Sequence, residues 1–238
     1  MFSRPSPSRG ASLAARARAL LLCAAALLSA CSSESKWEDY YRDAVVPYYL
    51  YLPGSASPSA PAPVVVVLLG ESASAAECFD LWQPIAEDRE LALICPELPD
   101  EALSDTSAME LRMGEVLTSA YGEASLAPRF FLAGFGDSGA FVLEYAFRYP
   151  QFVSGVSVMS VEAFPTPSSS AAHAPFQFAV GESDRDGQTA AEAAAETWRQ
   201  AGLLVRVVSV AGNGNRPNQD FARLVGELAS QTSRQTMP

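Results

Sequence analysis

The stretch from Phe130 to Pro150 reads FFLAGFGDSGAFVLEYAFRYP and decides the fold. It opens with an apolar run of Phe, Phe, Leu and Ala, and a turn rich in glycine follows (Gly134, Gly136 and Gly139). An amphipathic segment then leads to the Tyr-Pro pair at the end. This pattern predicts a buried strand that turns sharply into a helix.

The rest of the chain repeats this alternation of strand and helix. Strands are expected at 45–52, 64–69, 91–95, 129–133, 153–159, 176–180 and 204–210, and helices at 75–88, 106–121, 138–148, 189–201 and 218–229. Pro47 would interrupt a central ladder, so the first strand is expected at an edge. The alternation indicates right-handed crossovers, and hence a mostly parallel central sheet flanked by helices. The connection between 159 and 176 is short, so no cap domain is expected.

The first thirty residues are typical of an export signal. Residues 1–18 contain four arginines and no acidic residue, and a short apolar run follows at 19–28. The run is too short to cross a membrane as a helix, which requires about 20 apolar residues. The segment Leu28-Ser29-Ala30-Cys31 resembles a bacterial lipobox, which implies cleavage before Cys31 and lipidation of that cysteine. The alternative is an ordinary signal peptide followed by a chance cysteine.

The lipobox implies a lipoprotein of the bacterial envelope, anchored to a membrane on the periplasmic face or at the cell surface. The two serines that follow Cys31 favour the outer membrane. We therefore divide the chain into a signal peptide (1–30), a tether (31–44), one domain (45–232) and a tail (233–238). The whole chain has a net charge of −11, which becomes more negative when the arginines of the signal are removed. A chain this acidic is not expected to bind nucleic acid.

Two of the four cysteines remain after the signal and the lipidated position are set aside. Cys78 and Cys95 are an even number in an oxidising compartment, so they form either a disulfide or two partly buried free thiols. No Cys or His spacing resembles a metal site, and His173 is the only histidine of the chain. Neither a metal nor a cofactor is expected.

Four landmarks between about residues 45 and 230 resemble the α/β-hydrolase superfamily, in particular small secreted esterases of the dienelactone-hydrolase-like and polyhydroxyalkanoate-depolymerase-like kind. They are Leu69-Gly70 after a buried strand, the turn Gly134-Phe135-Gly136-Asp137-Ser138-Gly139-Ala140, the helix end Arg148-Tyr149-Pro150, and Gly181-Glu182-Ser183-Asp184 after a later strand. The turn corresponds to the nucleophile elbow, in which a strained strand-to-helix turn lifts the nucleophile above the sheet. The resemblance therefore implies the three-layer α/β-hydrolase fold.

The same resemblance implies a catalytic triad that this sequence has altered. Family elbows read Gly-x-Ser-x-Gly-Gly, with Tyr-Pro some thirteen residues after the serine, and this spacing places Gly136 at the nucleophile position. Asp184 matches the family acid. Asn215 stands where the family has histidine, and an amide does not titrate near neutral pH. The oxyanion hole is made of backbone N–H groups, which here belong to Asp137 and the turn at Glu71.

A second register takes Ser138 as the nucleophile, within the segment Gly136-Asp137-Ser138-Gly139-Ala140. It resembles the Gly-Asp-Ser elbow of lipase-like esterases. Ser138 is otherwise expected to satisfy a free backbone N–H in the first turn of the helix. His173 precedes Asp184, which is the wrong chain order for a Ser–Asp–His triad, although a loop could bring it to the site.

Losing either the serine or the histidine of a triad lowers turnover by about a million-fold. The leading hypothesis is therefore a lipid-anchored, catalytically inactive protein that binds a small ligand or a protein partner through the former active-site cleft. The alternative is a serine esterase that uses Ser138. A third interpretation is an envelope lipoprotein whose fold only spaces an interaction surface.

Overall fold

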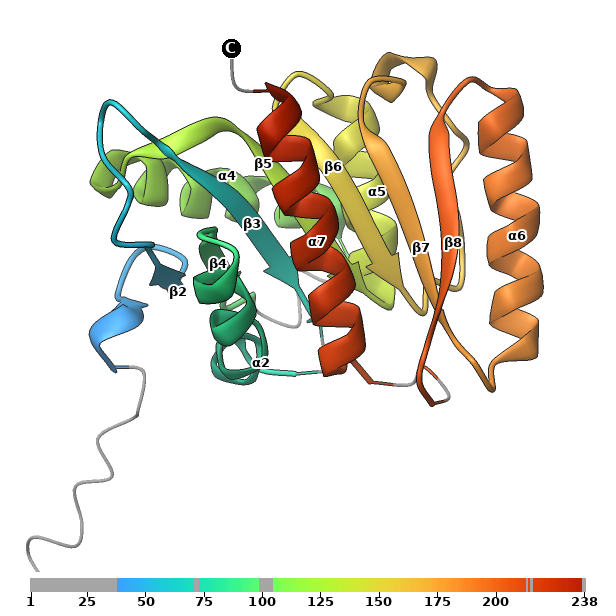
Figure 1. Cartoon of the computed structure of the whole chain (residues 1–238), viewed down its shortest axis with the longest axis horizontal. Coiled ribbons are helices and arrows are strands. Elements are labelled where there is room, and N and C mark those ends of the chain that lie inside the picture. Colours follow the sequence, from blue (N-terminus) through green and yellow to red (C-terminus); the bar gives the residue numbers. More distant parts are fainter. Residues whose placement is uncertain (1–37, 71–72, 99–104, 213, 215, 237–238) are drawn as a thin grey trace, which may run out of the picture. The chain divides into compact units, whose positions relative to one another are not determined.

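The computed structural model describes residues 38–70, 73–98, 105–212, 214 and 216–236 (Figure 1). The expected signal peptide, Cys31, Glu71 and Asn215 lie outside these residues. Residues from Asp39 onward form one compact unit.

The described strands form one sheet in the order β1-β2-β4-β3-β5-β6-β7-β8 (Figure 1). Strands β3 to β8 run parallel, while β1 and β2 pair antiparallel at one edge. The elbow strand β5 lies between β3 and β6 in the middle of the sheet. The bounds are β1 (Tyr41–Arg42), β2 (Tyr48–Tyr51), β3 (Ala62–Leu68), β4 (Ala92–Pro96), β5 (Leu126–Phe135), β6 (Val153–Met159), β7 (Pro175–Gly181) and β8 (Leu204–Val210).

Helices cover both faces of the sheet, which gives three layers. Helices α2 and α7 pack together in front of the sheet in Figure 1, and α4 and α5 lie behind it. Helix α6 packs on β7 and β8 and shares one hydrophobic core with α4 and α5. The bounds are α2 (Ala75–Asp88), α4 (Thr106–Glu123), α5 (Asp137–Arg148), α6 (Arg185–Gln200) and α7 (Gln219–Thr236), with short 3-10 turns η1 (Glu38–Tyr40) and η3 (Ser169–Ala171).

Alternation along the strands explains how both faces are filled. In β7, Phe176 and Phe178 face α6, where the ring of Trp198 meets both rings edge-on at centroid distances of 5.2 and 5.0 Å. Between them Gln177 faces the opposite side and donates a hydrogen bond to Ser157 Oγ at 2.8 Å. A period of two therefore directs aromatic side chains to one helical layer and smaller or polar side chains to the other.

The two ends of the domain differ from the expected boundaries. The expected tether (31–44) contains the first strand, because Tyr41 pairs with Tyr49 and the ring of Tyr40 packs on Phe79 at 5.0 Å. At the other end, α7 continues to Thr236 and includes most of the expected tail (233–238). Aromatic packing and an amphipathic helix end thus extend the fold beyond 45–232.

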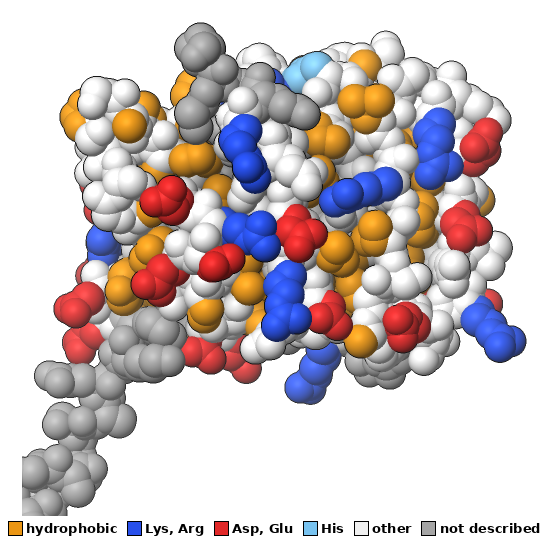
Figure 2. Space-filling view, viewed as in Figure 1, with side chains coloured by type: hydrophobic (Ala, Val, Ile, Leu, Met, Phe, Trp, Pro, Cys, Tyr) orange, Lys and Arg blue, Asp and Glu red, His pale blue; other side chains and the backbone are white. Residues whose placement is uncertain are grey.

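The described residues contain no cap domain, and between β6 and β7 the only helical turn is η3. Among the same residues, no helix has the length and hydrophobicity that a membrane span requires. On the face that carries α2 and α7, acidic and basic side chains are interspersed with apolar ones (Figure 2). This face therefore mixes both signs of charge, although the chain as a whole is acidic.

Candidate functional site

The turn between β5 and α5 has the geometry of a strained elbow at Gly136. This residue has φ 57° and ψ −129°, a conformation that costs a residue with a side chain about 1–3 kcal/mol. Its N–H donates to the carbonyl oxygen of Met159 at 3.0 Å, which fixes the turn to the end of β6. Its own carbonyl accepts from the N–H of Gly139 at 2.9 Å as α5 begins. The structure thus places Gly136 at the apex of the turn.

The neighbouring glycines are packed tightly, whereas the apex is open. A Cβ on Gly134 would lie 2.7 Å from Gly139 Cα and 2.8 Å from the carbonyl oxygen of Ser138. A Cβ on Gly139 would lie 2.5 Å from a methyl group of Val161. A Cβ on Gly136 would meet no atom of the described residues within 4 Å. The apex therefore has room for a side chain that the sequence does not supply.

Ser138 occupies the first turn of α5 and is 1% exposed. Its Oγ lies 2.8 Å from the position that a Cβ would take on Gly70, so the side chain is directed at the end of β3. This hydroxyl has no hydrogen-bond partner among the described residues. The expected bond to a free N–H of the helix is therefore not formed, because the hydroxyl is packed against Gly70.

Asp184, at the acid position, is the N-cap of α6. Its Oδ1 accepts a hydrogen bond from the N–H of Gly187 at 2.9 Å. Gly187 is needed for this contact, because a Cβ there would lie 2.2 Å from Asp184 Oδ2. The carboxylate is therefore engaged in holding the start of a helix at the carboxyl edge of the sheet.

The loop after β8 reaches the same edge through Gly214, beside the position of Asn215. The carbonyl oxygen of Gly214 accepts a hydrogen bond from Ser160 Oγ. Ser160 directly follows Met159, the residue that holds Gly136, and it has φ 56°. Contacts of the described residues therefore link the elbow to the loop that carries Asn215.

His173 lies at the opposite end of the strands, where β6 begins. Its Nε2 is 2.9 Å from the carbonyl oxygen of Pro150, and the ring is exposed. Pro150 precedes β6, whose seven residues span roughly 20 Å before the elbow edge is reached. The structure thus does not bring the only histidine to Gly136, Ser138 or Asp184.

A cavity of about 430 Å³ lies beside the elbow, at the carboxyl ends of β6 and β7. Its lining combines apolar side chains with three carboxylates; it comprises Val158, Ser160, Val161, Glu162, Phe164, Phe178, Ala179, Val180, Asp184, Asp186, Gly187, Ala190, Ala191 and Gly214. The sequence analysis missed Ser160 and Glu162. Their position directly after a parallel strand is the signal that could have identified them, because ligands bind outside the carboxyl ends of such strands.

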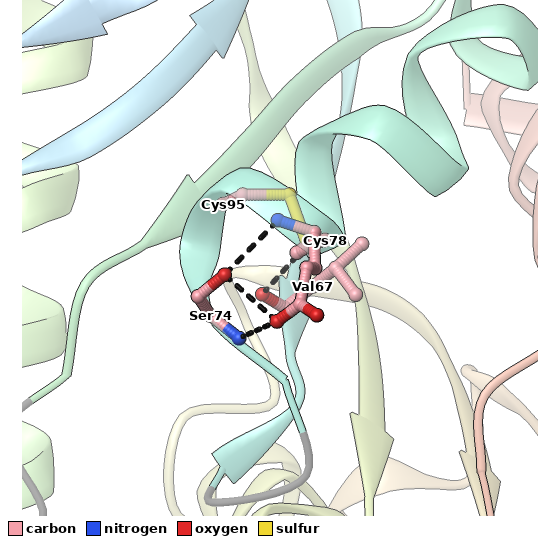
Figure 3. The surroundings of a disulfide bond; sticks show 5 residues. Val67, Ser74, Cys78 and Cys95 are labelled. Carbon is pink, nitrogen blue, oxygen red and sulfur yellow. Dashed lines mark hydrogen bonds between the residues drawn. A yellow bond between two sulfur atoms is a disulfide. The ribbon is translucent and has the colours of Figure 1, made fainter. Parts of the chain in front are cut away.

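On the other side of the elbow, a disulfide joins Cys78 in the first turn of α2 to Cys95 in β4 (Figure 3). The two Cα atoms are 6.1 Å apart and both residues are buried. The adjacent Ser74 caps α2, and its N–H donates to Glu77 Oε2 at 2.8 Å. This backbone hydrogen bond lowers the pKa of the Glu77 carboxyl below its ordinary value. Within the described part of the chain, no group of three or more His, Cys, Asp or Glu side chains could hold a metal ion.

No protein-family model matches the sequence, and no curated protein matches it. Solved structures do match. A thermostable esterase superposes with a TM-score of 0.60 at 12% identity, over 83% of this chain, which spans 62% of that esterase. The fluorophosphonate-binding serine hydrolase FphF of Staphylococcus aureus gives 0.60 at 13% identity, over 77% of this chain and 92% of its own.

A carboxylesterase of Bacillus cereus gives a TM-score of 0.57 at 16% identity, over 80% of this chain and 96% of its own. Identities this low report on the fold. The mostly parallel sheet and the helices that flank it match the fold of these neighbours. The chain therefore has the α/β-hydrolase fold.

Proposed function

We propose that this protein keeps the frame of a serine hydrolase without its turnover, and that it binds a ligand or a protein partner at the elbow edge of the sheet. One observation carries the proposal: the apex of the elbow is Gly136, which has no side chain, and no atom of the described residues lies within 4 Å of its Cβ position. The position of His173 supports it, since acyl transfer to serine needs a base within hydrogen-bond reach.

The magnitudes favour binding over catalysis. Removal of the nucleophile or the base of a triad lowers turnover by about a million-fold, and the effects are not additive. What remains from binding and oxyanion contacts is on the order of a thousand-fold over water. Such residual activity is too small for a physiological esterase.

The proposal includes the cellular setting that the sequence implies. Lipid at Cys31 would anchor the domain to a membrane of the bacterial envelope, with the outer membrane favoured. Metabolic labelling with an alkyne fatty acid tests this part: the wild-type chain should take up the label and Cys31→Ala should not.

The test of the main proposal is ester hydrolysis by the full chain on short acyl esters. The wild type should show at most the residual rate of about a thousand-fold over water, and the double variant Gly136→Ser with Asn215→His should exceed the wild type. The serine would enter the open space at the apex, and the histidine would supply the missing base. Wild-type turnover well above this residual rate would overturn the proposal.

The second candidate is a serine esterase that uses Ser138, and the names of the structural neighbours favour it. It requires the buried hydroxyl of Ser138 to become accessible and a base other than a nearby histidine. A fluorophosphonate probe separates the two candidates. Labelling of the wild type that Ser138→Ala removes would establish the esterase, whereas an unlabelled wild type agrees with the binding protein.

A further inference from the structure

The cavity beside the elbow has a composition that selects one class of ligand. We propose that it binds a small organic monocation, an ammonium group carried on an apolar body. This inference rests on the proposed function, because it names the ligand of the elbow edge. The volume of about 430 Å³ falls within the range of roughly 300–1,000 Å³ of small-molecule sites.

The walls of the cavity provide the apolar contacts. The rings of Phe164 and Phe178 lie 4.6 Å apart between centroids, and both line the cavity. Val161 and Ala191 add aliphatic surface from the loop after β6 and from α6. Aromatic faces attract cations as well as apolar groups, so these walls suit both parts of an organic ammonium ion.

The charged lining residues are all acidic. Glu162 comes from the loop after β6, and Asp184 and Asp186 come from the start of α6. No Lys, Arg or His stands among the described lining residues, and Arg185 is exposed outside the lining. A cavity lined by one sign of charge concentrates ions of the opposite sign. Charge complementarity therefore favours a cation and disfavours a carboxylate.

The cavity is also continuous with the elbow frame. Val161 packs against Gly139. Ser160 donates to the carbonyl oxygen of Gly214, and the preceding residue, Met159, accepts from the N–H of Gly136. Asp184 is held by its bond to Gly187, so its carboxylate is fixed at the cavity before any ligand arrives. A preorganised charge loses little entropy when it binds.

The test uses three probes with one apolar body: 3-phenylpropylamine, 3-phenylpropan-1-ol and 3-phenylpropanoate. Each is titrated into the full chain and followed by amide NMR. The amine should shift resonances of Val161, Gly187 and Ala191, with a dissociation constant on the order of a millimolar for a probe of this size. The alcohol should bind about tenfold more weakly, and the carboxylate should not bind. Equal binding of amine and alcohol, or shifts elsewhere in the chain, overturns the proposal.

Neutral variants of the acidic side chains sharpen the test. Glu162→Gln with Asp186→Asn should weaken amine binding about tenfold, since two exposed charges are removed, and should leave alcohol binding unchanged. Asp184 is left intact because it caps α6. Glu192→Gln, on α6 outside the cavity, is the matched control and should not change amine binding. Unchanged amine binding in the double variant overturns the proposal.

The two proposals fail separately. Ester turnover that depends on Ser138 would overturn the proposed function and leave the amine titration to be judged alone. Loss of selectivity for the amine would overturn the ligand class while a silent ester assay still stands.

Discussion

Helices α2 and α5 both begin at the carboxyl edge of the sheet, but they begin in different ways. At α2, Ser74 Oγ accepts from the N–H of Glu77 at 3.2 Å while the Glu77 carboxylate accepts from the N–H of Ser74, and a disulfide fixes Cys78 one residue later. At α5, the N-cap is Gly136, which makes no side-chain cap and has φ 57°. One start is held by side chains, and the other by a backbone conformation that glycine adopts more easily than any other residue.

Among the described residues, the remaining α-helices begin as α2 does, with a side chain that caps the first turn. Asp105, Asp184 and Asn218 each accept a hydrogen bond from an N–H in the first turn of α4, α6 and α7. A cap of this kind stabilises a protein by about 1 kcal/mol. A helix that lacks one, and begins from a strained turn instead, is shaped by something other than stability. The contrast supports a functional origin for the elbow, although its apex now has no side chain.

The disulfide is expected to give the largest effect on the α2 side. Replacing Cys78 and Cys95 together by Ala opens a loop of 17 residues and should lower the free energy of unfolding by about 3 kcal/mol. Chemical denaturation of the variant beside the oxidised wild type measures the difference. The reduced wild type should match the variant. If both have the same denaturation midpoint as the oxidised wild type, then the disulfide does not stabilise the start of α2.

Gly134→Ala is expected to give the largest effect on the α5 side, about 2–3 kcal/mol of destabilisation. The new Cβ would meet backbone atoms of Gly139 and Ser138, which cannot turn aside as a flexible side chain would. Gly114→Ala is the matched control, because Gly114 lies inside α4 with no atom near its Cβ position. That substitution should raise stability by up to about 1 kcal/mol. Equal signs for the two variants would contradict tight packing at the elbow.

The sequence predicts the frame of the fold well and the arrangement of side chains less well. Apolar runs and glycine turns are local signals, so the strand at 153–159 and the helix at 75–88 have the predicted bounds. The spacing from Tyr149 indicates Gly136 for a similar reason, because helix length is a local property. The tether prediction fails at Tyr40 and Tyr41, since their contacts with Phe79 and Tyr49 come from distant segments.

The geometry of the site depends on contacts between segments that are distant in the sequence. A local sequence pattern does not predict such contacts. Nothing local distinguishes a histidine at the amino edge of the sheet from one that a loop carries to the elbow; the bond between His173 and Pro150 decides it. The positive φ of Ser160 and its bond to Gly214 likewise depend on the loop after β8. The packing of Ser138 against Gly70 depends on the register between β3 and β5.

Gly136→Ala measures the strain at the apex without a steric clash. The substitution should destabilise the protein by about 1–2 kcal/mol, because φ 57° is unfavourable for alanine while the Cβ meets open space. Gly202→Ala is the control outside the site: Gly202 has φ 86° and equally open surroundings. Similar losses in thermal denaturation would show that the backbone alone sets the penalty. A loss at Gly136 as large as that at Gly134 would mean that the apex is packed.

Ser74→Ala is expected to have the smallest effect, a loss of about 1 kcal/mol from one half of the capping box. Ser209→Ala, at an exposed position of β8, should stay within about 0.5 kcal/mol. The other half of the box is tested by pH. Because the N–H of Ser74 lowers the pKa of Glu77, its contribution is present above the unfolded value of about 4.3 and is lost as pH falls through the lower folded value. Glu77→Gln should therefore flatten the acid side of the stability profile.

The losses of stability in Ser74→Ala and Gly136→Ala decide how the starts of α2 and α5 compare. If Ser74→Ala lowers stability less than Gly136→Ala, then the elbow imposes on a side-chain residue a backbone penalty larger than the contribution of a side-chain cap, as in a turn built to lift a nucleophile. If the order is reversed, the turn imposes little penalty on a residue with a side chain. The conformation of Gly136 would then follow from the packing of Gly134 and Gly139 alone, and the elbow would need no functional explanation.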